Sequence, residues 1–157
     1  MKKITLLCCT LFSLALCAYS QVKTATIRIS RPLSGSHVPQ DGNTIEFSTS
    51  LHLALGFKPV VFVKDPIGGY WPYLGADQDQ NDINRWTIQN VQFGNGDDSG
   101  RRFEVRVIAL SDRLLENGFP YHGKTIYIEN NTPLTLGMIV SLSHRATMSQ
   151  LVTVIRD

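Results

Sequence analysis

The sequence predicts an all-β protein: an antiparallel β-sandwich of about seven to nine strands with one short helix. Three observations support this fold class. Apolar and polar residues alternate in many short segments, which is the period of a strand with one buried face. Glycine, proline, asparagine and aspartate separate these segments and favour turns. A single segment carries helix signals at both ends, with Ser111 as the start and Gly118 as the stop.

The clearest strand is the segment 102–110, which we expect at the centre of a sheet. Every second residue from Phe103 onward is apolar, and the residues between them are charged as far as Arg106. Antiparallel sheets tolerate such a solvated face. Ile108 and Leu110 then replace the charged residues, so we expect the end of this strand to be covered on both faces.

Other segments predict the remaining strands. Segments 25–30 and 44–51 also alternate, whereas 59–63 is continuously apolar, as in a strand buried on both faces. Between the first two, Pro32 and Pro39 predict an irregular crossing at a sheet edge, because proline cannot donate to a β-ladder. Later strands are expected at 86–93, with a bulge at Gln89–Asn90, and at 125–128, 137–142 and 151–155.

Three polar segments connect these strands. The Asp-Pro-Ile-Gly-Gly segment 65–69 predicts a turn that leads into Tyr70, and 75–84 predicts a polar loop. Segment 95–100 predicts a hairpin loop that joins the Trp86 strand to the central strand.

Residues 1–20 predict a secretory signal peptide, which leaves 21–157 as one mature domain. Two lysines precede an apolar run that is too short to span a bilayer, and the small residues Ala18 and Ser20 suit a cleavage site. A lipoprotein signal ending at Cys17 is the alternative, although a bulky leucine precedes this cysteine. We therefore expect an exported protein, either periplasmic or secreted.

Composition argues against several classes of function. All three cysteines (Cys8, Cys9 and Cys17) lie in the signal, so we expect a mature domain without disulfides, thiol catalysis or cysteine-bound metal. Of 15 basic residues, Lys2 and Lys3 also lie there, and the remaining ones balance the 13 acidic residues. This balance argues against a nucleic-acid partner. No later apolar run is long enough to predict a transmembrane helix.

Four motifs follow one another in a particular order over the segment 25–115. A Pro-x-x-Gly-x-x-Val step begins at Pro32, an aromatic turn begins at Gly69, a strand begins at Trp86, and an Asp-x-Gly-x-x-Phe step ends at Phe103. In this order the motifs resemble the bacterial immunoglobulin-like domain of exported proteins. The resemblance implies an immunoglobulin-like β-sandwich with an adhesive, spacer or accessory role, since the fold alone does not define an activity.

The aromatic cluster Tyr70, Trp71 and Tyr73 is the first candidate ligand-binding site. Exposed aromatic faces can stack on sugar rings or on proline-rich peptides. The alternative is that Trp71 packs at one end of the sandwich beside Trp86, because aromatic side chains bury a large area. If Trp71 points to the core, the alternation places Tyr70 on the outside.

The acidic run that contains Asp77, Asp79 and Asp82 is a weak calcium candidate. Its first residues imitate an EF-hand loop, but Asp82 stands where that loop needs glycine and Ile88 where it needs glutamate. A looser site shared with Asp97–Asp98 and a solvated polar loop are the two remaining interpretations.

No catalytic residue, metal centre or cofactor is predicted. The histidines (His37, His52, His122 and His144) lack the spacing of ligands on one element. The loop before Trp71 is similar to one in immunoglobulin-like inhibitors of cysteine proteases, but their Arg-Pro-aromatic loop is missing. We expect a non-catalytic binding or accessory module for a protein or glycan of the cell envelope or extracellular space. A carbohydrate-binding module is the first alternative, and an enzyme assembled from scattered loops is the second.

Overall fold

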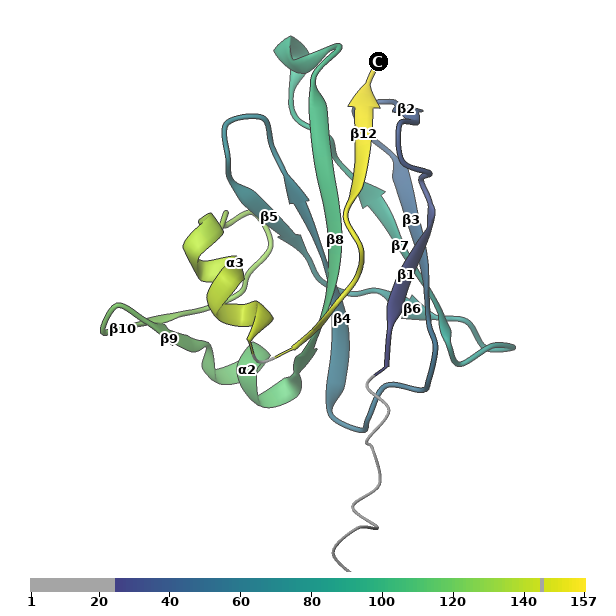
Figure 1. The fold of residues 1–157 in the computed structure, drawn as a ribbon. Coiled ribbons are helices and arrows are strands. Elements are labelled where there is room, and N and C mark those ends of the chain that lie inside the picture. Colours follow the sequence, from purple (N-terminus) through teal and green to yellow (C-terminus); the bar gives the residue numbers. More distant parts are fainter. Residues whose placement is uncertain (1–24, 145) are drawn as a thin grey trace, which may run out of the picture.

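The computed structural model describes residues 25–144 and 146–157, which form two packed β-sheets and a smaller third layer (Figure 1). The predicted all-β, antiparallel sandwich is therefore confirmed. The described residues form twelve strands and two short α-helices, more than expected, because several strands are only two or three residues long. The predicted signal peptide lies outside the described residues. Within them, no helix is long and apolar enough to cross a membrane.

The first sheet has four antiparallel strands in the order β1-β3-β7-β6. Its strands are β1 (Ile27–Arg31), β3 (Asn43–Thr49), β7 (Arg85–Val91) and β6 (Asp77–Gln78). Between β3 and β7 the register shifts, so that one residue of β3 opposes Gln89 and Asn90. Asn90 has a φ of 60°, as expected in a bulge, which confirms the predicted position.

The second sheet has six strands, with the order β2-β12-β8-β4-β5 and β11 also paired to β8. Its strands are β2 (His37–Val38), β12 (Val152–Arg156), β8 (Arg102–Ser111), β4 (Phe57–Lys64), β5 (Tyr70–Tyr73) and β11 (Thr147–Met148). Among the described strands of this sheet, β2 and β12 are the one parallel pair. The chain changes sheets between β1 and β2, which is the crossing that Pro32 and Pro39 predict.

The main core lies between the two sheets, where alternate residues of β8, such as Phe103 and Val105, meet Phe47 of β3 and its neighbours. A second apolar cluster covers the opposite face of the second sheet, over Ile108 and Leu110. The expectation that the end of β8 is buried on both faces is therefore correct.

The third layer lies over this second cluster (Figure 1). It consists of α2 (Asp112–Asn117), β9 (Phe119–Tyr121), β10 (Lys124–Ile126) and α3 (Leu136–Ser143). The helix α2 has the predicted caps, because the side chain of Ser111 accepts a hydrogen bond from Leu114 N at 3.3 Å and Gly118 ends it with a φ of 70°. This layer explains why the second sheet has no solvated face at this level.

Three local expectations are wrong. The segment 75–84, expected as a polar loop, contains the short strand β6, which pairs with β7. Segment 137–142 is helical within α3, because Thr135 caps it and Ile139 and Leu142, three residues apart, bury one helix face. The segment 95–100 is not a hairpin loop but crosses from β7 in the first sheet to β8 in the second. Both edges of β8 are already paired, with β4 on one side and β12 on the other, so β7 has no place beside it.

Candidate ligand-binding cleft

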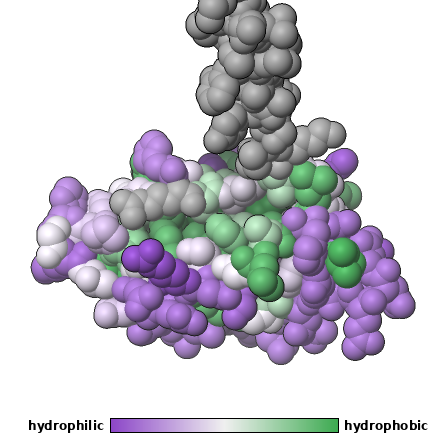
Figure 2. All heavy atoms as spheres, turned by 90° about the horizontal axis from the view of Figure 1, so that it is seen from below, coloured by the Kyte–Doolittle hydropathy of each residue, from purple (hydrophilic) through white to green (hydrophobic). Residues whose placement is uncertain are grey.

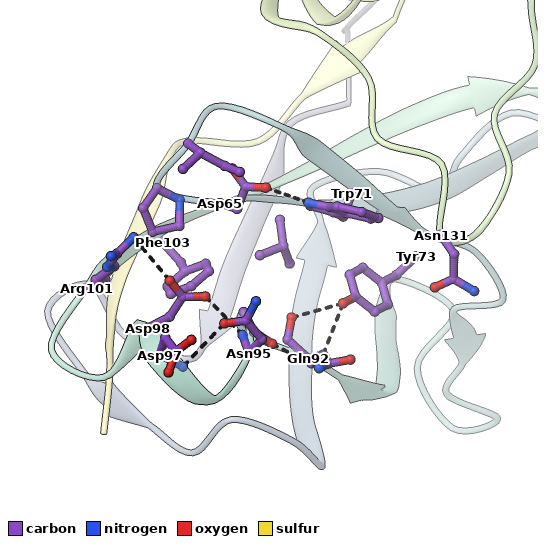
Figure 3. A pocket seen from close by; sticks show the side chains of 14 residues that line it. Asp65, Trp71, Tyr73, Gln92, Asn95, Asp97, Asp98, Arg101, Phe103 and Asn131 are labelled. Atoms are coloured by element: carbon purple, nitrogen blue, oxygen red, sulfur yellow. Dashed lines mark hydrogen bonds and ion pairs between the residues drawn. The ribbon is translucent and has the colours of Figure 1, made fainter.

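A cleft of about 490 Å³ opens at one end of the sandwich (Figure 3). The turn between β4 and β5 forms one wall, and the link from β7 to β8 forms the opposite wall, with Asn131 of the third layer at one side. Val63 and Phe103, which belong to the main core, form its floor. The volume is in the range of about 300–1,000 Å³ that is typical of small-ligand sites.

The aromatic wall comes from β5, in which the side chains alternate between two environments. Trp71 and Tyr73 are half-buried and line the cleft, whereas Tyr70 points the other way into the second apolar cluster and is 4% exposed. Of the three predicted aromatic residues, Tyr70 therefore has no face for a ligand. Trp71 does not pack beside Trp86, which borders a different hollow.

Trp71 is held in place by the carboxylate of Asp65. Its indole N–H donates to Oδ2 of Asp65 at 2.8 Å, and the backbone N–H groups of Gly68 and Gly69 donate to Oδ1 at 2.7 and 2.9 Å. Gly68 has a φ of 105°, which a side chain would disfavour, so the Asp-Pro-Ile-Gly-Gly turn can close tightly around this carboxylate. The ring consequently has a defined orientation over the cleft (Figure 3).

Tyr73 is fixed by the backbone of Gln92, which directly follows β7 of the opposite sheet. Its hydroxyl donates to Gln92 O at 2.9 Å and accepts from Gln92 N at 3.2 Å. Burial raises the pKa of the Tyr73 hydroxyl above its ordinary value; the hydrogen bond from the Gln92 backbone lowers this pKa, and the charge of Asp41 raises it. The hydroxyl is therefore neutral at physiological pH and joins the two sheets at the edge of the cleft.

The polar wall is built around the 3₁₀ helix η1 (Gly96–Asp98). Asn95 caps this helix through its Oδ1, which accepts from Asp97 N at 3.3 Å, while Oδ2 of Asp98 accepts from Asn95 N at 3.0 Å. Arg101 lies 3.3 Å from Oδ1 of Asp98. These bonds leave the side chain of Asp97 without a hydrogen bond to any described residue.

The cleft therefore combines two fixed aromatic rings with carboxylate, amide and guanidinium groups. Asn131 makes no side-chain hydrogen bond to the described residues, and Gln92 uses only its Nε2, which donates to Gly94 O. Such groups can donate to or accept from a ligand. No histidine, serine or lysine is among the described residues that line the cleft. Its lining suits the binding of a ligand.

The acidic run lies at the opposite end of the sandwich from η1 (Figure 1). Asp77 belongs to β6, and the carboxylates of Asp79 and Asp82 accept hydrogen bonds from Asn81 N and Asn84 N of their own loop at 2.8 and 3.0 Å. Over the ranges 25–144 and 146–157, no three acidic, histidine or cysteine side chains are close enough to hold a metal ion. Because the two loops lie at opposite ends of the sandwich, they do not come together as a shared calcium site.

A second, smaller hollow of about 350 Å³ lies at this opposite end, near the connection from β3 to β4. Trp86 borders it, and its indole N–H is buried without a partner in the described part of the chain. Leu51, Leu55 and Phe57 are exposed nearby, and Figure 2 shows apolar surface at this end.

Several residues of the cleft were not predicted as site residues. The sequence places Asp65 only in a turn and Asn95 only in a loop, it offers Asp97 only as part of a looser calcium site, and it gives no role to Gln92 and Asn131. The usable signals were the Asp-x-x-Gly-Gly turn and the capping pattern from Asn95 to Asp98. Neither signal shows that the two segments face each other.

The sequence matches no protein-family model. It also has no significant match among curated proteins.

Proposed function

We propose that this protein is an exported, non-catalytic binding module of the immunoglobulin-like type, and that it binds a glycan in the cleft. The signal-peptide pattern of residues 1–20 supports export. The order of motifs from Pro32 to Phe103 supports the immunoglobulin-like type.

The observation that carries the proposal is the presentation of Trp71 and Tyr73 opposite a polar wall. Sugar rings combine apolar faces with hydroxyl groups, so they match a site with an aromatic wall and hydrogen-bonding side chains. The hydrogen bonds of Asp65 and Gln92 fix the two rings before a ligand arrives. Such pre-organisation lowers the entropy lost on binding.

The test is isothermal titration calorimetry of the purified protein against a panel of oligosaccharides. We expect Trp71→Ala to weaken binding at least about fivefold, because aromatic anchors commonly contribute more than about 1 kcal/mol. Trp86→Phe is the matched control at the other end of the sandwich and should leave the affinity unchanged. A Trp71→Ala protein that folds normally and binds as tightly as the wild type would contradict the proposal.

A further inference from the structure

Acidic side chains outnumber basic ones around the cleft. Asp65, Asp97 and Asp98 contribute three carboxylates, whereas Arg101 is the one cation among the described residues that line it. Arg156 lies behind η1, where its buried guanidinium donates to the carbonyl groups of Asn95 and Gly96. Even with this second cation included, the surroundings of the cleft retain an excess of negative charge.

The aromatic wall strengthens this preference for a cation. A cation is attracted to the electron-rich face of an indole ring. The N–H of Trp71 donates to a carboxylate at 2.8 Å, and this charge-assisted bond polarises the ring further toward negative charge. The face of Trp71 is turned toward the cleft (Figure 3).

The three carboxylates differ in how many hydrogen bonds and ion pairs they already make within the protein. Asp65 accepts two hydrogen bonds from its own turn and one from the indole of Trp71, and Asp98 accepts from Asn95 N and faces Arg101. Asp97 has no side-chain hydrogen bond to a described residue and is exposed. A ligand cation between the Trp71 ring and η1 would find its hydrogen-bond acceptor in Asp97.

From this juxtaposition we infer that the cleft selects an amine-bearing sugar, which packs on Trp71 and directs its ammonium groups toward the opposite wall, where Asp97 is the free acceptor. The inference rests on the proposed glycan binding and adds the chemical class of the ligand. The amide groups of Gln92 and Asn131, on the other side of the cleft, are available to the hydroxyl groups of the same sugar. A lysine side chain carries an ammonium group but no hydroxyl groups, so it would leave the amides of Gln92 and Asn131 without partners on the ligand. The observations therefore favour a sugar over a lysine side chain.

The experiment compares two probes with the same sugar backbone, the tetramer of glucosamine, which carries ammonium groups, and the tetramer of N-acetylglucosamine, which carries neutral acetamido groups. Calorimetry with the purified protein should give an affinity about tenfold higher for the glucosamine tetramer, as expected for a cation–π contact with a nearby carboxylate. The preference should decrease when the salt concentration is raised from about 0.05 M to about 0.5 M. It should also disappear at a pH at which the amine is neutral.

Three variants locate the effect. Asp97→Asn should reduce the preference to about threefold, and Arg101→Gln, which removes the competing cation, should increase it by a similar factor. Glu116→Gln removes one negative charge from α2, at the other end of the molecule, and should change nothing. All three side chains are exposed, so folding is expected to be preserved.

The outcomes separate the two proposals. Equal affinity for both tetramers, or an unchanged preference in Asp97→Asn, would overturn the inference while glycan binding stands. Binding of neither tetramer nor any other glycan would overturn the proposed function itself. Binding of a lysine-containing peptide in place of both sugars would show that the ammonium belongs to a protein partner, which also overturns the inference.

Discussion

Replacement of Gly94 by alanine tests how tightly the polar wall of the cleft is packed. Gly94 has a φ of 71°, a conformation that side chains disfavour. A Cβ atom at this position would lie 2.7 Å from Cζ of Phe103 and 3.0 Å from Cβ of Asp98, and closer still to Oδ2 of Asp98. Phe103 is 1% exposed and packs edge-on against Phe93, so it has little room to move.

The expected loss of stability has two parts. The left-handed backbone costs alanine about 1–2 kcal/mol. The steric overlap with Phe103 and Asp98 adds about 1–3 kcal/mol, as is typical of overpacking in a core. We therefore expect Gly94→Ala to lower the free energy of unfolding by about 2–5 kcal/mol.

Gly100→Ala is the matched control, because Gly100 lies in the same link with a φ of 75° and has no atom within 4 Å of an added Cβ. Gly100→Ala should therefore lose only the stability that the left-handed backbone costs, about 1–2 kcal/mol. The free energy of unfolding of both variants is measured by urea denaturation, with the slope m compared to confirm that the transition is unchanged. Equal losses for the two variants would refute the argument that Gly94 is required by its close neighbours.

Two further predictions concern the aromatic wall. In Asp65→Asn, the side-chain amide can still accept from the turn but presents a donor to the indole N–H, so we expect a loss of about 1–2 kcal/mol and easier acrylamide quenching of Trp71 in a Trp86→Phe background. Unaltered quenching would show that Asp65 does not orient the ring. Tyr73 has a raised pKa in the folded state, so its contribution to stability is present below the unfolded pKa of about 10 and is lost as the pH rises above it. Above about pH 10, the free energy of unfolding should therefore fall less steeply with pH in Tyr73→Phe than in the wild type, as measured by urea denaturation at a series of pH values. An equal slope in both proteins would contradict this assignment.

The alternating and apolar patterns of the sequence were sufficient for the fold class. Burial follows from the side-chain period, which is a local property, so the segment 102–110 and the run 59–63 indicated their buried faces correctly. Helix caps are also local, and Ser111 and Gly118 therefore predicted the bounds of α2. The sequence also predicted the crossing near Pro32, because proline cannot take part in a continuous ladder.

The partners of each strand were decided only by the tertiary structure. The link 95–100 has the composition of a hairpin loop, but β8 pairs with strands distant in sequence, and competition for its two edges is not visible locally. The apolar segment 137–142 fits a strand or a helix, and packing of Ile139 and Leu142 in the second cluster selects the helix.

The cleft shows the same division between local and non-local information. Sequence alone identified Trp71 and Tyr73 as candidates, because aromatic residues near a turn are recognisable from composition. Which of them face outward depends on the face of β5 that the third layer covers, and this contact buries Tyr70 instead. The opposite wall comes from the segment between Gln92 and Arg101, later in the chain. Only the packing of two sheets brings Asp97 opposite Trp71, since contacts between distant segments depend on the whole fold.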